Sequence, residues 1–168
     1  MIYQVYCDGS TRGNGKEKAV GAWAYVVINP NYNTMSAADC QAVAGTTNQR
    51  MELHAAIEGI TKALTFLEKG DVINVYTDSA YLHNCYTQGW YKNWQKNGWR
   101  NSKKEPVANQ DLWEMLIPYF EMFEVNFHKV KGHAGGRNNH EMWNEYVDEL
   151  AQNASTRLKE KIDANSGN

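Results

Sequence analysis

The sequence predicts an α/β domain whose core is a mixed five-stranded sheet, an antiparallel hairpin plus parallel crossovers, flanked by helices. Segments rich in β-branched and aromatic residues lie at 2–7, 20–28, 72–77 and 123–130, as expected of strands. A helical apolar period separates the second of these from the third. Because a strand, a helix and a further strand form a right-handed crossover, we expect the strands at 2–7 and 72–77 to be parallel neighbours.

The first part of the chain is predicted to form a hairpin after the first strand. The strand at 20–28 is followed by the turn-rich Asn29-Pro30-Asn31 and Asn33, and a returning strand is expected at about 40–45. Residues 20–28 and about 40–45 then pair antiparallel as a hairpin that follows the first strand. The hairpin and the crossover strands together make a mixed sheet of five strands.

The first helix is expected from Asn48 to a stop at Lys69-Gly70. Its apolar positions follow three-and-four spacing: Leu53, Ala56, Ile57, Ile60, Leu64 and Leu67. Thr46, Thr47 and Asn48 are candidates for its N-cap. Gly59 inside this helix costs about 1 kcal/mol relative to Ala, so we interpret it as a point of close packing on the sheet.

Three further helical segments are predicted. A short one runs from Ser79 to about Gly89, and another opens at Asn109 and should end or kink at Pro118. The last has its apolar positions at Trp143, Val147, Leu150, Ala151, Ala154 and Leu158. We expect a single catalytic domain at 1–162 and a flexible polar tail at 163–168.

Four acidic residues stand at the ends of these elements. Asp8 and Asp78 each follow a strand, and parallel neighbours bring their carboxyl ends together at the edge where α/β sheets bind ligands. Glu52 lies near the start of the first long helix, and Asp148 lies early in the last one. Taken alone, Asp8-Gly9 is more typical of a hairpin turn. Together, the four positions indicate a carboxylate site.

The carboxylates suggest metal-dependent chemistry. Clustered carboxylates repel one another unless a cation compensates them. Hard oxygen ligands favour Mg²⁺, with Mn²⁺ as a possible substitute. Two such ions about 4 Å apart are the usual device for displacement at a phosphodiester. We therefore expect phosphodiester hydrolysis.

Composition limits the remaining possibilities. Seventeen Lys plus Arg residues against nineteen Asp plus Glu residues give a net charge of −2, which neither indicates nor excludes a nucleic-acid partner. Cys7, Cys40 and Cys85 are far apart, which is typical of reduced thiols and makes zinc unlikely. No apolar run approaches the roughly 20 residues of a membrane span. We expect a cytoplasmic protein without membrane contact, and a monomer.

Five segments, in order along the chain, resemble type 1 ribonuclease H. They are Asp8-Gly9-Ser10, Thr47-Asn48-Gln49-Arg50-Met51-Glu52-Leu53, Thr77-Asp78-Ser79, Val130-Lys131-Gly132-His133-Ala134-Gly135, and Asn144-Glu145 with Asp148-Glu149-Leu150-Ala151. The resemblance implies a ribonuclease H-like fold. It also implies cleavage of the RNA strand of RNA–DNA hybrids with two Mg²⁺ ions, leaving 5′-phosphate and 3′-hydroxyl ends.

The resemblance further implies roles for single residues. Asp8, Glu52, Asp78 and Asp148 would hold the metal ions, and His133 would assist proton transfer or product release. Substrate contacts would come from Thr11, Gly13, Asn14, Thr47, Asn48 and Gln49, facing the wide minor groove or the DNA backbone. Helix capping is an equal alternative for Thr47 and Asn48. No role is assigned to the segment from Arg137 to His140.

The stretch from Trp90 to Lys104 combines aromatic and basic residues and contains no acid. It resembles the basic protrusion that holds the DNA strand in some family members, with contacts expected from Trp90, Lys92, Trp94, Lys96 and Arg100. Cations beside aromatic rings are the usual grip on a nucleic-acid strand. The four-residue spacing of Trp90 and Trp94 also fits a helical core stripe. Trp23, Trp113 and Trp143 are interpreted as core residues.

Two other functions fit parts of the pattern. A resolvase or integrase core would use similar acids to cut DNA, but such cores lack the segment from Thr47 to Glu52 and the basic stretch. A hybrid-binding module without activity would be expected to have lost one of the four carboxylates. A cleavage assay on hybrid and on duplex DNA distinguishes these functions.

Overall fold

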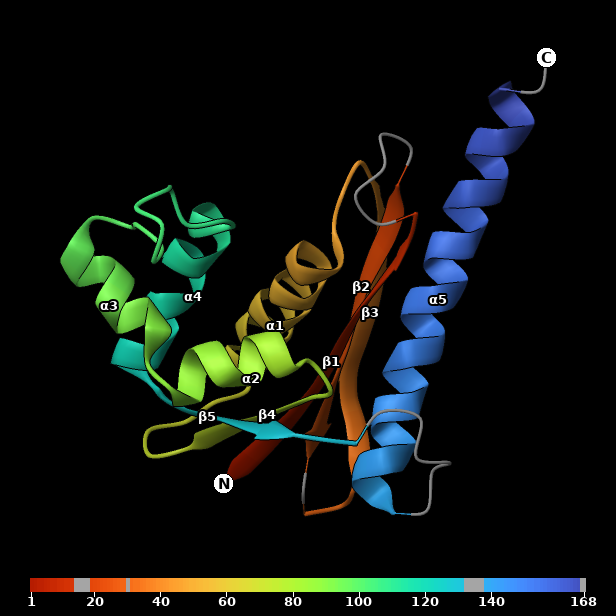
Figure 1. The fold of residues 1–168 in the computed structure, drawn as a ribbon. Coiled ribbons are helices and arrows are strands. Elements are labelled where there is room, and N and C mark those ends of the chain that lie inside the picture. The colour runs from red at the N-terminus through yellow and green to blue at the C-terminus, as the bar shows by residue number, and fades with distance from the viewer. Residues whose placement is uncertain (14–18, 30, 132–137, 167–168) are drawn as a thin grey trace.

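The computed structural model describes residues 1–13, 19–29, 31–131 and 138–166. It contains one mixed sheet between two helical layers (Figure 1). The strands are β1 (Ile2–Arg12), β2 (Val20–Asn29), β3 (Thr34–Ala44), β4 (Val72–Thr77) and β5 (Glu124–Lys129). The helices are α1 (Asn48–Leu64), α2 (Ala80–Thr87), α3 (Trp90–Asn97), α4 (Gln110–Met122) and α5 (Asn139–Ser166).

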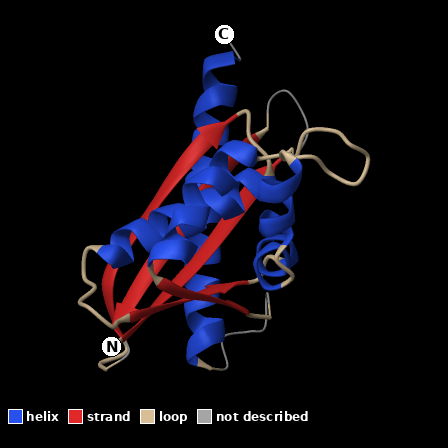
Figure 2. Ribbon diagram, turned by 90° about the vertical axis from the view of Figure 1, so that its left-hand side faces the viewer, coloured by secondary structure: helices blue, strands red, loops and turns tan. Residues whose placement is uncertain are grey.

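The strand order β3-β2-β1-β4-β5 confirms the predicted sheet. β1 pairs antiparallel with β2 and parallel with β4, and β4 pairs parallel with β5. On one face, α1, α2 and α4 close a large apolar core around the fully buried Trp113 and Leu53. On the other face α5 packs on β1, β2 and β3 through Val147 and Ala151 (Figures 1 and 2). No helix in the described ranges has the length and apolarity needed to cross a bilayer.

Helix α1 is capped at its N-terminus and packs tightly on β1 at Gly59. Thr47 is its N-cap, and the Thr47 hydroxyl accepts a hydrogen bond of 3.3 Å from the Arg50 amide. A Cβ on Gly59 would lie 2.5 Å from a methyl carbon of Val5. The predicted close packing at Gly59 is therefore confirmed, and only a residue without a side chain fits there.

Strand β1 is longer than predicted. It does not stop at Cys7 but runs to Arg12, because β2 continues to pair with it as far as Val20. The parallel pairing with β4 ends earlier, at Tyr6 opposite Tyr76. Asp8 therefore lies inside β1, just past the point where β4 separates from it.

Strand β3 begins at Thr34 and not at about Cys40 as predicted. The intervening residues, Ser36, Ala37 and Ala38, have little intrinsic strand preference, but β2 is buried along its length and its ladder supplies their partners. Tertiary pairing overrides local propensity here.

Two helix boundaries also differ from the predictions. α4 continues past Pro118 to Met122, because Leu116 and Ile117 are buried and hold the helix against the core. α1 ends at Leu64, so the predicted last turn to Leu67 is not helical. At the C-terminus, residues 163–166 of the expected tail belong to α5.

Candidate active site

Asp8 is placed by the register of two parallel strands. Tyr6 is opposite Tyr76, so the same register two residues later sets Asp8 opposite Asp78, with neighbouring strands about 4.8 Å apart. β1 also passes directly under the start of α1: a Cβ on Gly9 would lie 2.5 Å from the Glu52 backbone nitrogen. The Asp-Gly dipeptide therefore serves a close approach and not a hairpin turn.

Glu52 is fixed through Ser79. The Ser79 hydroxyl donates a hydrogen bond of 2.6 Å to Glu52 Oε2. Ser79 is also the N-cap of α2, and its hydroxyl oxygen accepts a hydrogen bond of 3.0 Å from the Leu82 amide. Burial raises the pKa of Glu52, the Ser79 hydrogen bond lowers it, and the charge of Asp78 raises it again. The net shift is upward. In the sequence Ser79 is only part of the Thr77-Asp78-Ser79 motif, because its link to Glu52 depends on the tertiary structure.

Asp148 projects from α5 toward Asp8. Burial of Asp8, which is 5% exposed, raises its pKa well above the ordinary range. The charges of Asp78 and Asp148 and hydrogen-bond contacts with both carboxyls raise it further. Gln152 orients Asp148 through a hydrogen bond of 2.9 Å to its Oδ2. The structure thus brings together all four predicted carboxylates, from β1, α1, the end of β4 and α5.

The donor set of this site suits a hard divalent cation. It consists of carboxylate oxygens, and the sulfur of the nearby buried Cys7 stays a neutral thiol because burial and the same acids raise the Cys7 pKa. Within the described ranges, no three His, Cys, Asp or Glu side chains are already arranged as a metal site. Burial, and after it the charges of the neighbouring acids, raise the pKa of Asp8, and a bound cation would favour the charged carboxylate. The residues therefore fit Mg²⁺ or Mn²⁺.

Comparison with known proteins identifies the family. Residues 2–156 match the family model described as RNase H. The chain belongs to the ribonuclease H family. Ribonuclease H of Syntrophomonas wolfei is 48% identical over 154 residues, which cover 92% of this chain and 96% of that protein. Ribonuclease H of Caldanaerobacter subterraneus is 38% identical, covering 98% and 95%. The family predicted from five motifs is confirmed.

Solved structures confirm the ribonuclease H fold. LC9-RNase H1, a type 1 RNase H with the type 2 active-site motif, has a TM-score of 0.70 at 27% identity, covering 92% of this chain and 72% of that chain. LC11-RNase H1, solved in complex with an RNA/DNA hybrid, has a TM-score of 0.66 at 19% identity, covering 93% and 98%. The second likeness supports the fold alone.

The predicted substrate residues of this ribonuclease H outside the basic stretch belong to two elements, the start of α1 and the end of β1. Thr47, Asn48 and Gln49 begin α1, and all three are exposed. Thr11 lies near the end of β1, and its buried hydroxyl has no hydrogen-bond partner among the described residues. Gly13 follows β1 and is exposed. Asn14, also predicted to contact substrate, and His133, predicted to be catalytic, lie outside the described residues.

A polar network that the sequence did not predict joins the start of α1 to the start of α4. Arg50 forms a bidentate ion pair with Asp111, with distances of 3.0 and 2.8 Å, and also donates to Asn109 Oδ1 at 3.3 Å. The Asn109 side-chain nitrogen in turn donates to Gln49 Oε1 at 3.4 Å. No sequence signal pairs residues sixty positions apart, although Asp111 in the first turn of α4 is a favourable helix-dipole position.

The basic stretch forms α3 and the loop after it. Trp94 is half-buried and packs on the fully buried Trp113, with ring centroids 5.7 Å apart. Trp94 therefore packs against the core, as the helical core-stripe alternative predicted, whereas Trp90 is exposed. Lys92, Lys96 and Arg100 are exposed too. A hollow of about 220 Å³ is lined by Trp90, Asn93, Trp94, Asn97, Arg100, Asn101 and Ser102.

The three tryptophans predicted to be core residues also differ in burial. Trp23 and Trp113 are buried, as predicted. Trp143 is only half-buried, and its indole nitrogen donates a hydrogen bond of 3.2 Å to Asn33 Oδ1 in the β2–β3 turn. It packs at the margin of the core under α5 and is not fully inside it.

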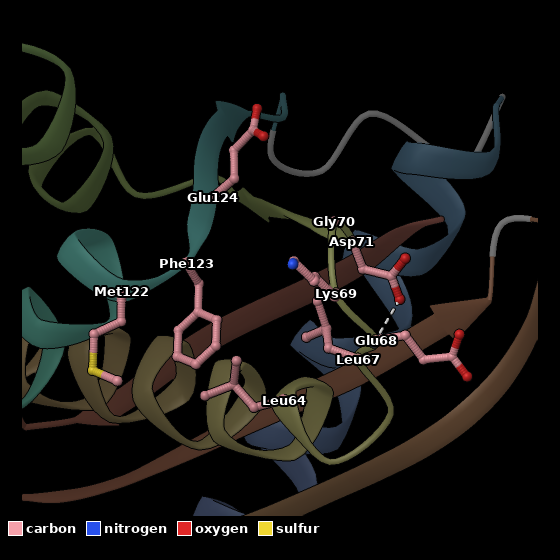
Figure 3. A pocket seen from close by; sticks show the side chains of 9 residues that line it. All are labelled: Leu64, Leu67, Glu68, Lys69, Gly70, Asp71, Met122, Phe123 and Glu124. Atoms are coloured by element: carbon pink, nitrogen blue, oxygen red, sulfur yellow. Dashed lines mark hydrogen bonds between the residues drawn. The ribbon is translucent and has the colours of Figure 1, made fainter.

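A larger hollow lies at the opposite end of the sheet. It measures about 440 Å³ and lies between the end of α1, the end of α4 and the amino ends of β4 and β5. Leu64, Met122 and Phe123 form its apolar side, and Lys69 and Asp71 stand at its rim (Figure 3). None of the four carboxylates lines it, so its size does not make it the active site.

Proposed function

We propose that this protein is an endonuclease that hydrolyses the RNA strand of RNA–DNA hybrids and leaves 5′-phosphate and 3′-hydroxyl ends. The observation that supports this most is the convergence of Asp78 and Asp148 on the buried Asp8, in a chain that belongs to the ribonuclease H family. Hydrolysis of hybrid RNA is the activity of that family.

The carboxylates of Asp8, Glu52, Asp78 and Asp148 are proposed as ligands of two Mg²⁺ ions, with Mn²⁺ as a substitute. When bound, a pair of such ions supplies an activated water and stabilises the leaving oxygen at a phosphodiester. Ser79 holds one oxygen of Glu52, and Gln152 holds one of Asp148. These partners fix the carboxylates in advance, so little reorganisation is needed during the reaction.

Proton transfer is assigned to His133. The proposal is based on the motif that contains it, since this residue lies outside the described part of the chain. A histidine titrates near neutral pH and can give a proton to the leaving oxygen. Its replacement should therefore lower turnover more than affinity.

Two surfaces are proposed to bind the hybrid. At the start of α1, Thr47, Asn48 and Gln49 face the minor groove and the DNA backbone, together with Thr11, Gly13 and Asn14 near the end of β1. On α3 and the following loop, Trp90, Lys92, Lys96 and Arg100 grip the DNA strand, with the edge of Trp94 lining the same hollow. The exposed position of all three cations supports this grip.

Cleavage of a labelled hybrid tests this function. We expect RNA-strand products with 5′-phosphates in Mg²⁺ or Mn²⁺, none in EDTA, and no cleavage of duplex DNA. Cleavage of duplex DNA in place of the hybrid would assign the chain to the resolvase or integrase type of nuclease. Binding of the hybrid without cleavage in either metal would make it a binding module.

We also propose that the protein acts as a monomer in the cytoplasm. All four carboxylates come from one chain, so no second copy is needed to complete the site. The three cysteines are free, which fits a reducing compartment. Light scattering on the purified protein and fractionation of the cells test these two points.

A further inference from the structure

Asn109 lies at the junction of three helices and does not use its side chain to start its own. It is the N-cap of α4, yet the side chain forms no capping hydrogen bond. Its backbone is left-handed, with φ of 65°, a conformation that asparagine tolerates better than most residues. The side chain instead contacts α1 through Gln49 and Arg50, and α2 through Tyr81. Asn109 therefore links helices where an N-cap residue would ordinarily satisfy one.

The hydrogen bonds of Asn109 fix the direction of its amide. Arg50 donates to Asn109 Oδ1 at 3.3 Å. Because a guanidinium has no acceptor, Asn109 can face it only with its oxygen. Asn109 Nδ2 then points the other way and donates to Tyr81 Oη and to Gln49 Oε1, each at 3.4 Å. Tyr81 Oη also accepts a hydrogen bond of 2.9 Å from Trp113 Nε1, which ties this junction to the core.

Asp111 holds the guanidinium at the start of this chain of hydrogen bonds. Its two carboxylate oxygens accept hydrogen bonds of 3.0 and 2.8 Å from Nη1 and Nη2 of Arg50. These hydrogen bonds lower the pKa of Asp111 and raise that of Arg50. A bidentate pair fixes the plane of a guanidinium as well as its position. The second hydrogen of Nη1 is therefore directed at Asn109.

The direction of the amide is passed on to Gln49. An amide nitrogen only donates, so Gln49 meets Asn109 Nδ2 with its oxygen. Gln49 Nε2 is then turned away from Asn109, and it forms no hydrogen bond with a residue that the structure describes. Gln49 is exposed at the start of α1. It thus presents a hydrogen-bond donor to a molecule that binds there.

We propose that Asp111 is a positioning residue for Gln49. Acting through Arg50 and Asn109, it turns the NH₂ group of this glutamine toward the minor groove of the hybrid. The inference rests on the proposed function, in which Gln49 contacts that groove. Every base pair presents an acceptor there, such as purine N3 or pyrimidine O2, whereas only a G·C pair adds a donor. A donor held outward therefore contacts the groove without selecting a base sequence.

The first test compares the loss of Asp111 with the loss of a matched ion pair. Asp111→Ala should raise KM for a hybrid by roughly 2- to 10-fold, the effect of one hydrogen bond, with kcat unchanged. Asp111→Glu keeps a carboxylate for Arg50 and should restore the wild-type KM. Asp163→Ala breaks the exposed pair of 3.1 Å between Lys159 and Asp163 on α5 and should leave KM unchanged. Thermal melting of the three variants shows that each is folded.

The second test changes single atoms of the substrate and measures hybrid affinity by anisotropy in EDTA. A deazapurine with C–H in place of N3 removes a groove acceptor and is moved along the hybrid one position at a time. The wild type should lose affinity by roughly 2- to 10-fold where Gln49 binds. Gln49→Ala should lose nothing further there, and Asp111→Ala should lose less than the wild type. Replacing guanine by hypoxanthine removes only the N2 donor and should leave the wild type unchanged.

Three results would overturn the inference. A loss with hypoxanthine and none with the deazapurines would mean that Gln49 accepts a hydrogen bond from the groove. Additive effects of Asp111→Ala and Gln49→Ala on affinity would mean that Asp111 acts elsewhere. A scan in which no deazapurine weakens binding of the wild type would mean that no donor contacts a purine N3. If instead the wild type bound the hybrid but did not cleave it in Mg²⁺, the proposed function would fail, and the scan would still decide how Gln49 is positioned.

Discussion

The carboxylate site and the basic stretch of α3 are built in opposite ways. The carboxylates come from four elements far apart in sequence, and the central one, Asp8, is almost fully buried among charges of its own sign. The cations of α3 come from one short segment and are exposed. A buried group loses its solvation and interacts strongly with its neighbours, whereas an exposed charge is screened. The first region should therefore control rate and the second should control affinity.

The largest expected effect concerns Asp8. Asp8→Asn should lower kcat by about 1000-fold or more, because several kcal/mol of stabilisation at the phosphodiester depend on the metal ligands. The protein should remain folded. A hybrid cleavage assay in Mg²⁺ measures the effect, and full activity of the variant would contradict the assignment of Asp8 as a ligand.

The same variant tests the repulsion between the acids. The pKa of Asp8 is raised in the folded state, so the metal-free fold binds this proton more tightly than the unfolded chain does. Stability from this group is complete below the ordinary carboxyl pKa of about 4 and decreases as pH rises toward the raised value. Metal-free Asp8→Asn should therefore melt at an equal or higher temperature than the wild type, with a difference that grows between pH 4 and 8. A lower melting temperature would mean that Asp8 supports the fold.

The next effect separates the two tryptophans of α3. Trp94→Ala should lower the free energy of unfolding by about 2–3 kcal/mol, less than for a fully buried tryptophan because Trp94 is only half-buried. Trp90→Ala is the matched control and should leave stability nearly unchanged while weakening hybrid binding. Urea titrations of both variants measure the free energies of unfolding. Equal values for the two variants would contradict the different burial of Trp94 and Trp90.

His133 is expected to act on rate alone. His133→Ala should lower kcat by about 10- to 100-fold with little change in hybrid affinity. The profile of kcat against pH should lose its dependence on a group that titrates near neutrality. If the His133→Ala variant turned over at the wild-type rate from about pH 6 to 9, His133 would be a surface residue without a catalytic role.

The smallest effect concerns the exposed cations. Replacing Lys92, Lys96 and Arg100 together by Ala should flatten the salt dependence of hybrid binding by up to about 3 units of slope, if each neutralises one phosphate. Turnover at saturating substrate should not change, since only uniform binding is removed. KM measured against ionic strength tests the grip, and an unaltered slope would refute it.

Much of the fold follows from local sequence patterns. The helical period after Asn48 and the alternation at 72–77 predicted α1 and β4, and the boundaries of β4 agree to the residue. Predictions were wrong where a partner element decides the outcome. β3 begins six residues early because β2 provides its ladder, and α4 passes Pro118 because its apolar face is buried.

The sequence by itself determined the family, the four acids and the order of the elements that carry them, because these depend on residue type and spacing along the chain. Tertiary structure alone decided how the acids meet: β1 passes under α1 at Gly9, Ser79 ties Glu52 to the end of β4, and Asp148 of α5 contacts Asp8. It also decided that Trp94 packs inward while Trp90 stays outside. Burial and contact between distant residues arise only when the sheet brings them together, and periodicity within one segment carries no information about its partner.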